Sequence, residues 1–383
     1  MKEGVFVLLE IFVFGLTYGG VIVIILAYLK LFQKSLNKLS IFLPLCIMGF
    51  VFIIFIIFEF TWDAGYGGLY TFFVSFIGLA LHMLVFCCIF LLIRCCVKDM
   101  TSKVWLWIGL TIICFVPVLY SLYGFIIPTV FKIEKVSFLS DKYTSDTPLK
   151  IIQLSDVHLG AVYQKKFVNK IVDKILDNNP DIVVITGDLF DDSLDVKESW
   201  LKPFNKIEVP IIFSAGNHDC YYEKSEVIKV INKTNIIYLN KDEYKYKGVR
   251  FVAVDYDEDL EKSLNEMKDQ GKLENDMTNI LLVHVPEKPK DLKKFNIFLS
   301  LSGHTHNGQV FPGNIFGLIM FDCMNGICDS GDTYTYVNSG IGSTFFPMRT
   351  FSRSKISIIS IKKKRVIYMI VFSYIIYMLN IKA

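Results

Sequence analysis

The stretch of sequence that decides the fold runs from residue 150 to residue 160 and reads KIIQLSDVHLG. Its apolar run over 150–154 predicts a buried β-strand, and Asp156 and His158 follow directly after that run. In α/β folds the ends of strands are where functional sites assemble, because the sheet fixes the backbone and the following loop carries the side chains. We therefore expect Asp156 and His158 to belong to a site at a sheet edge.

The pattern around this stretch alternates strands with helices. Helices are predicted over 166–179, where apolar residues recur at helical spacing up to Pro180, and over 223–232. Strands are predicted over the ranges 181–186, 211–214, 249–254, 279–283, 296–300, 335–337 and 355–361. The β-α-β-α-β order of the first half predicts a parallel sheet, while the second half is mainly β. We interpret residues 137–361 as one α/β domain.

Four further polar clusters follow predicted strands in the same way. They are Gly187-Asp188, Gly216-Asn217-His218-Asp219, His284 and Gly303-His304-Thr305-His306. Aspartate, asparagine and histidine without a thiolate form a set of oxygen and imidazole donors, which suits Mn, Fe or Zn better than Ca. Together with His158, these clusters hold five of the six histidines in the chain, which argues against chance.

The number of donors fits two divalent metal ions. One ion can be held by Asp156, His158 and His306, the other by Asn217, His284 and His304, with Asp188 bridging the two. Two such ions can clamp a phosphate group and share a hydroxide that acts as the nucleophile. Their charge exceeds that of the two aspartates and the hydroxide, which favours an anionic substrate.

The order of these motifs resembles the calcineurin-like metallophosphoesterase superfamily. The run GHTHNGQV over 303–310, with YVNSGIG over 336–342 and Pro347-Met348-Arg349, is similar to the bacterial membrane-associated branch of that superfamily. The resemblance covers residues 137–361. It implies an α/β fold, an αββα sandwich with a dinuclear metal site at the strand ends, and the ligand roles given above.

The same resemblance implies roles for residues that do not bind metal. His218 is expected to be catalytic and to contact the phosphate or the leaving oxygen, beside Asn217. Asp191 has the spacing of the carboxylate that orients this histidine, although Asp192 and Asp219 are alternatives. Arg349 is expected either to bind a substrate phosphate or to form a surface salt bridge.

The first part of the chain has a different composition. Residues 1–131 hold only 12 of the 77 charged side chains, although the whole chain is 53% hydrophobic. A helix needs about 20 apolar residues to cross a bilayer. The ranges that qualify predict an all-α bundle of four transmembrane helices: 5–28, 41–58, 69–93 and 104–130.

The loops between these segments predict an orientation. Lysine and arginine are found in the loops after the first and third segments and are absent between the second and third. The positive-inside rule then places residues 137–361 on the extracytoplasmic side of the cell membrane. Cys323 and Cys328 can pair if the domain lies outside and stay reduced if it lies inside. The tail over 362–383 is basic and then apolar, and we favour a surface segment over a fifth span.

Together these features predict a membrane-anchored, dinuclear-metal-dependent hydrolase of phosphate mono- or diesters, with lipid or cell-envelope substrates. The net charge of +3 is too small to favour nucleic acid as a partner. A non-catalytic, metal-stabilised sensor or binding module coupled to the helices is the alternative. A transporter is disfavoured, because the helices contain few ionisable residues and no broken pair.

Overall fold

The computed structural model describes residues 68–96, 103–160, 162–191, 196–221, 223–345 and 347–364. Two of the predicted apolar segments, 5–28 and 41–58, lie outside these residues. The apolar part of the tail, 366–383, also lies outside them. The membrane bundle as a whole is therefore a prediction from the sequence.

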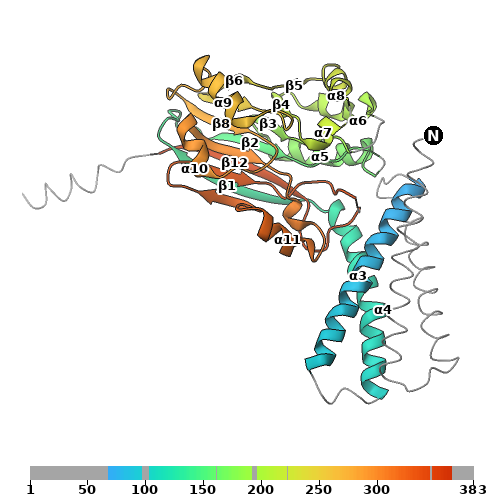
Figure 1. Cartoon of the computed structure of the whole chain (residues 1–383). Helices are drawn as coiled ribbons and strands as arrows, with labels where there is room; N and C mark the ends of the chain where they lie inside the picture. Colours follow the sequence, from blue (N-terminus) through green and yellow to red (C-terminus); the bar gives the residue numbers. More distant parts are fainter. Residues whose placement is uncertain are drawn as a thin grey trace, which may run out of the picture.

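Two long helices precede the α/β domain (Figure 1). Helix α3 (Gly68–Cys96) and helix α4 (Lys103–Ile126) pack against each other and coincide with the predicted segments 69–93 and 104–130. A short 3-10 turn, η1 (Ile127–Thr129), leads from α4 into the first strand. Within the described part of the chain, no helix combines the length and the apolar character needed to cross a membrane.

The first sheet has the strand order β1-β12-β2-β3-β4-β5. Its strands are β1 (Lys132–Ser140), β2 (Leu149–Leu154), β3 (Ile182–Thr186), β4 (Ile211–Ser214), β5 (Ile236–Tyr238) and β12 (Lys355–Lys363). Strands β2 to β5 are mutually parallel, as the β-α-β-α-β order predicts. Strand β12 makes the sheet mixed, because it is antiparallel to β2 and parallel to β1.

The second sheet has the order β10-β11-β9-β8-β7-β6. Its strands are β6 (Asp242–Tyr246), β7 (Val249–Ala253), β8 (Thr278–Leu282), β9 (Ile297–Ser302), β10 (Gly326–Asp329) and β11 (Tyr334–Val337). The four inner strands are parallel, and the edge strands β6 and β10 are antiparallel to their neighbours.

The two sheets stack face to face with helices on both outer sides. Successive residues of a strand point to opposite faces, so Ile151 of β2 packs in the core between the sheets while Ile152 packs under the helices. The first sheet is covered by α5 (Lys165–Asn178), α6 (Glu198–Leu201) and α8 (Lys224–Ile231), and the second by α9 (Leu260–Asp269) and α10 (Pro289–Leu292). The predicted αββα sandwich is thus confirmed.

The structure differs from the sequence prediction at several elements. Strand β1 begins at Lys132, before residue 137, and β12 continues into the basic run that starts at Lys362. Strands β1, β5, β6 and β10 were not predicted, and neither were helices α9 and α11 (Gly313–Met320). Strand β6 reads DEYKY and helix α11 reads GNIFGLIM, so neither shows the apolar alternation or the helical spacing on which such predictions depend.

Candidate metal centre

The polar clusters lie at the carboxyl ends of five strands. Asp156 and His158 follow β2, Asp188 follows β3, and Asn217 and His218 begin the short helix α7 (Asn217–Tyr221) after β4. From the second sheet, His284 follows β8, and His304 and His306 follow β9. Because both sheets present these ends to the same edge of the sandwich, the two sets of side chains meet there.

The first group of donors consists of Asp156, His158 and His306. Their candidate ligand atoms all lie within 4.8 Å of one another. Nε2 of His158 is 3.1 Å from Nε2 of His306, which is 3.4 Å from Oδ1 of Asp156. All three side chains are buried. This is the set that the sequence assigned to one ion.

The second group consists of Asp188, His284 and His304. Oδ2 of Asp188 lies 3.0 Å from Nε2 of His284, and Nδ1 of His304 lies 3.0 Å from Oδ1 of Asn217. Asp188 also groups with His158 and His218 in a third set. The structure therefore brings together all seven residues predicted as ligands, with Asp188 between the two groups.

Most of these residues have an unusual backbone. The φ angles of Asp156, His158 and Asp188 are each 52°, that of His304 is 70° and that of His306 is 49°. Such left-handed conformations cost about 1–3 kcal/mol each for residues other than glycine, and they persist only where surrounding contacts hold them. Backbone strain of this kind concentrates at functional sites, which supports the assignment of the site independently of the donor set.

Glycine is required where the loops approach most closely. A Cβ atom on Gly303 would lie 2.3 Å from Oδ2 of Asp156 and 1.8 Å from the hydroxyl oxygen of Ser155. Gly187 has φ +82°, and a Cβ atom there would lie 2.4 Å from Nδ1 of His284. These two glycines allow the loops of the two sheets to meet at the site.

The side chains fit metal ions. Nε2 of His284 is buried and lies 3.0 Å from Oδ2 of Asp188. Nδ1 of the same ring is 2.9 Å from the carbonyl oxygen of Thr186, to which it can donate. Such a bond fixes the ring and leaves Nε2 to face an ion, as is usual for histidine ligands. Asp156 and Asp188 supply the negative charge that two cations need.

The electrostatics of the group follow from burial and close charges. Burial alone would raise the pKa of Asp188, but His284 and His158 hold it below its usual value. Burial alone would lower the pKa of His284, but Asp188 and Asp156 raise it to about 9. The pKa of His304 is lowered to about 4 by burial and by His284.

These values predict how metal binding depends on pH. An ion must displace the proton that His284 holds below about pH 9, so apparent affinity is expected to rise by up to tenfold per pH unit between about 6.5 and 9. His304, already neutral in this range, adds nothing to the slope. The same raised pKa stabilises the metal-free protein below pH 6.5, and that contribution is lost as pH rises through 9. Calorimetric titration with Mn²⁺ in two buffers of different ionisation enthalpy measures affinity and proton release, and a flat affinity would contradict the prediction.

His218 and Asp191 lie beside both groups. The His218 side chain is 11% exposed, and its Nδ1 is 3.6 Å from Oδ1 of Asp191. The same carboxylate oxygen is 3.3 Å from Nδ1 of His158. Asp191 is therefore placed to orient two histidine rings, as the resemblance implies for one of them. Asp192, an alternative partner, lies outside the described residues.

Asp219, the other alternative, has a different position. Its carboxylate accepts hydrogen bonds from the backbone N–H groups of Leu189, Phe190 and Gly216. It therefore ties the loop after β3 to the loop after β4. Burial and the nearby Asp188 raise its pKa to about 7. The sequence offered Asp219 only as a partner for His218, and this loop-bridging role was missed, because it depends on backbone groups.

The structure contradicts the surface salt bridge that was one of the two expectations for Arg349, while phosphate binding by Arg349 stays a prediction. Arg349 is fully buried, so it forms no surface salt bridge, and its guanidinium group is taken up by other contacts. It donates to the carbonyl oxygens of Ser339 and Gly342 and lies 2.9 Å from Nδ1 of His306. Burial and this cation keep the pKa of His306 well below its usual value, so the ring stays neutral, as a metal ligand requires.

Replacing Arg349 should therefore weaken metal binding. In Arg349→Met, the backbone of His306 loses support, because Arg349 donates to the hydroxyl group of Ser352, which in turn donates to the carbonyl oxygen of His306. We expect Mn²⁺ affinity to fall by about 10- to 100-fold. The stability of the fold should fall as well, because two buried carbonyl groups lose their donors. Competition with a fluorescent chelator measures the affinity, and Arg353→Met, at an exposed position nearby, is the matched control. Equal affinities in the two variants would contradict this role.

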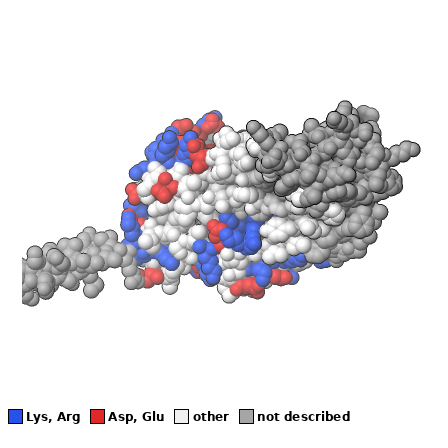
Figure 2. Space-filling view, turned by 90° about the horizontal axis from the view of Figure 1, so that it is seen from below, with Lys and Arg blue, Asp and Glu red and all other residues white. Residues whose placement is uncertain are grey.

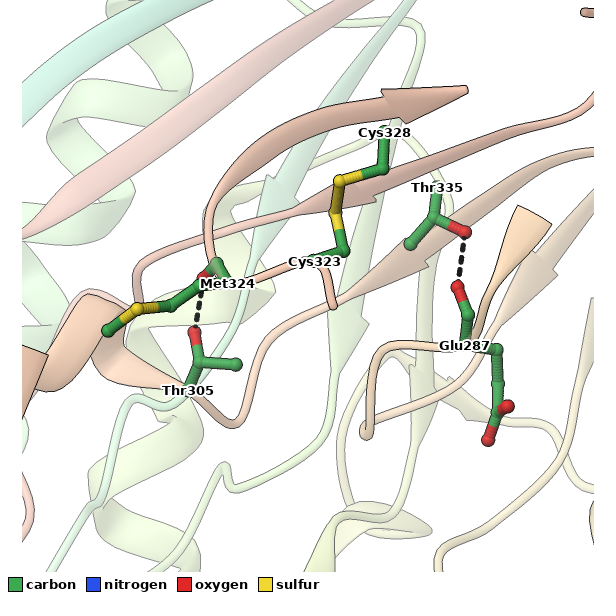
Figure 3. Close-up of a disulfide and its surroundings, with 6 residues drawn as sticks. All are labelled: Glu287, Thr305, Cys323, Met324, Cys328 and Thr335. Atoms are coloured by element: carbon green, nitrogen blue, oxygen red, sulfur yellow. Dashed lines mark hydrogen bonds between the residues drawn. A yellow bond between two sulfur atoms is a disulfide. The ribbon is translucent and has the colours of Figure 1, made fainter. Parts of the chain in front are cut away.

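A disulfide supports the loop that carries His304 and His306. Cys323 and Cys328 are bonded, which settles the pairing that the sequence left open. Between them, the carbonyl group of Met324 accepts a 2.6 Å hydrogen bond from the hydroxyl group of Thr305, the residue between the two histidines (Figure 3). The cross-linked loop therefore fixes the backbone of two candidate ligands.

Comparisons with known proteins show what this chain is similar to. Residues 149–308 match the model of the calcineurin-like phosphoesterase family. An uncharacterized metallophosphoesterase of Helicobacter pylori is 32% identical over 61% of this chain and 64% of its own. A Danio rerio protein named transmembrane protein with metallophosphoesterase domain is 31% identical over 56% of this chain and 53% of its own. The crystal structure of a dimetal phosphatase from Danio rerio is 10% identical, with TM-score 0.39, over 57% of this chain and 100% of that one.

The match of residues 149–308 and the His/Asp cluster make this domain similar to the metal-dependent phosphoesterases. Residues 149–308 are similar in sequence to the calcineurin-like phosphoesterase family. The chain spans less than two thirds of the length of both curated relatives named above.

Proposed function

We propose that the protein is a membrane-anchored phosphoesterase that uses two divalent metal ions to hydrolyse phosphate mono- or diesters. The observation that carries this proposal is the position of Asp188 between two groups of buried donors. One ion would be held by Asp156, His158 and His306, and the other by Asn217, His284 and His304. When bound, such ions supply an activated water and neutralise phosphate charge.

The protein's own residues complete the proposed chemistry. His218 is partly exposed beside both groups, so it can contact a phosphate oxygen and protonate the leaving oxygen. Asp191 holds the imidazole ring of His218 in place and would stabilise its charged form. Asn217 can contact the phosphate from the same short helix. No protein nucleophile is required.

The experiment that tests this function uses the purified full chain in detergent. Turnover of p-nitrophenyl phosphate and of bis-p-nitrophenyl phosphate is measured after chelation and after addition of Mn²⁺, Fe²⁺ or Zn²⁺. We expect turnover of at least one ester to depend on added metal. The rates with the three metals identify the metal that supports activity, and the rates with the two esters give the preference for monoesters or diesters. Absence of metal-dependent turnover of both esters would overturn the proposal and favour a binding or sensor module.

The membrane part of the proposal rests on the sequence. Support comes from the apolar segments of residues 1–131 and from the printed name of the Danio rerio relative. An extracytoplasmic domain is supported by the lysine and arginine bias of the loops and by the Cys323–Cys328 disulfide, since disulfides persist in oxidising compartments. After mild reduction of intact cells, an impermeant thiol reagent should label Cys323 and Cys328. Labelling only after lysis would place the domain inside.

A further inference from the structure

Helix α11 exposes an apolar surface that the proposed chemistry does not use. Its exposed side chains belong to Ile315, Phe316, Leu318, Ile319 and Met320, with exposed fractions between 48% and 79%. Only Gly317 of this helix is buried, against the side chain of Met324. Between residues 303 and 321 the chain has no lysine, arginine, aspartate or glutamate. A soluble protein rarely exposes so many large apolar side chains together without a partner.

Both ends of α11 are attached to the metal centre. The helix follows the turn η4 (His306–Gly308), which carries one candidate ligand. After the helix, the ring of Phe321 packs edge to face on the ring of His304, with 5.8 Å between the centroids. The apolar surface is therefore a direct neighbour of the two groups of donors.

A second loop extends this surface with aromatic side chains. Phe345 is 68% exposed and Phe351 is 51% exposed. Gln309 fastens this loop beside α11, because its side chain bonds the backbone of Thr344 and its carbonyl group accepts from the N–H group of Phe351. Exposed phenylalanines, like tryptophans and leucines, are typical of the apolar face of segments that lie in the membrane interface.

The surface is continuous with the end of α4. The backbone N–H group of Arg349 donates to the carbonyl oxygen of Gly124, and the hydroxyl group of Tyr120 donates to the carbonyl oxygen of Thr350. Nearby, Leu119 on α4 and Val130, which follows η1, are themselves 67% and 56% exposed. In Figure 1, α11 lies on the lower side of the α/β domain beside the upper end of α4. The lower side, seen in Figure 2, has wide areas without charged side chains.

From these contacts we propose that α11, Phe345 and Phe351 form a bilayer-docking surface that holds the metal centre at the level of lipid headgroups. The inference rests on the proposed function and deepens it, because a centre held there would act on phosphate esters of lipids or of molecules at the membrane surface. An amphipathic or apolar helix of this kind lies in the interface without spanning the bilayer.

Photo-crosslinking in the full chain tests the docking surface. The photoreactive residue benzoylphenylalanine is placed at Ile319 or Phe316, and the protein is reconstituted in vesicles of phosphatidylethanolamine and phosphatidylglycerol that contain a fluorescent phospholipid. Lys262 of α9, whose side chain is 74% exposed on the opposite side of the domain, is the negative control. Leu119 of α4 reports on anchoring. We expect lipid adducts at 319 and 316 at a yield at least tenfold above that at 262.

The outcomes separate the two proposals. Lipid adducts at 119 without adducts at 319 and 316 would overturn the docking surface and leave anchoring intact. Crosslinks from residue 319 to another part of this chain, or to a second copy of it, would show that protein covers α11. This result would also overturn the docking surface. Equal yields at 262 and 319 would indicate nonspecific reaction and count against it. Turnover of the soluble esters is measured separately, so the hydrolase proposal stands or falls on its own.

Discussion

The Asp188→Asn protein is expected to lose phosphoesterase activity by about 10³-fold while keeping its fold. Among the described residues, Asp188 groups with donors from both proposed ion sites, through His158 on one side and His284 on the other. Its carboxylate also accepts a 2.9 Å hydrogen bond from the N–H group of His218. The amide of asparagine can keep that hydrogen bond through its oxygen, but it removes the negative charge between the ions.

Two properties of the Asp188→Asn protein are measured, namely its phosphoesterase activity and its metal content. We expect fewer than two ions per chain by elemental analysis, together with the loss of turnover of bis-p-nitrophenyl phosphate. Asp177→Asn, on the exposed face of α5, makes the same chemical change away from the site and should be unaffected. Full activity in Asp188→Asn would remove the main support for a dinuclear centre.

The His218→Gln protein is expected to separate catalysis from metal binding. His218 lies beside the donors without belonging to either predicted ion set, so its loss should leave the metal content unchanged. General acid catalysis by a positioned side chain is worth about 10²–10⁴-fold. We therefore expect a loss of this size for an alkyl phosphate ester, which has a poor leaving group. With p-nitrophenyl esters the loss should be much smaller, because that leaving group needs no proton.

Steady-state kinetics with the two kinds of leaving group measure this effect. Asp191→Asn is the companion variant, since it leaves the histidine in place and removes its partner. It should show the same dependence on the leaving group with a smaller loss. Equal losses for both leaving groups in His218→Gln would assign His218 to phosphate binding alone.

The sequence predicts the parts of this protein that depend on periodicity and on motifs. Strands β2, β3 and β4 are apolar runs, and each is followed by a polar residue that must leave the core, so both the strand and the site residue can be predicted together. The grouping of the metal-donor residues can also be predicted, because parallel strands bring their carboxyl ends to one edge of the sheet.

Other features depend on contacts that no local pattern encodes. The burial of Arg349 follows from carbonyl groups of residues 339 and 342 and from His306, which meet only in the folded chain. Strand β6 is held as an edge strand by pairing with β7, despite its charged sequence. Helix α11 lacks a polar face, so its sequence does not distinguish a helix from a buried strand.

The left-handed backbone of Asp156, Asp188 and His306 has a consequence for how this sequence can vary. Glycine adopts that conformation at lower cost than aspartate or histidine does. Replacing these residues with glycine should therefore relieve local backbone strain while removing the donors. Selection for stability and selection for activity act in opposite directions at these positions. A collection of variants screened only for heat resistance would accumulate inactive proteins with changes at the metal centre.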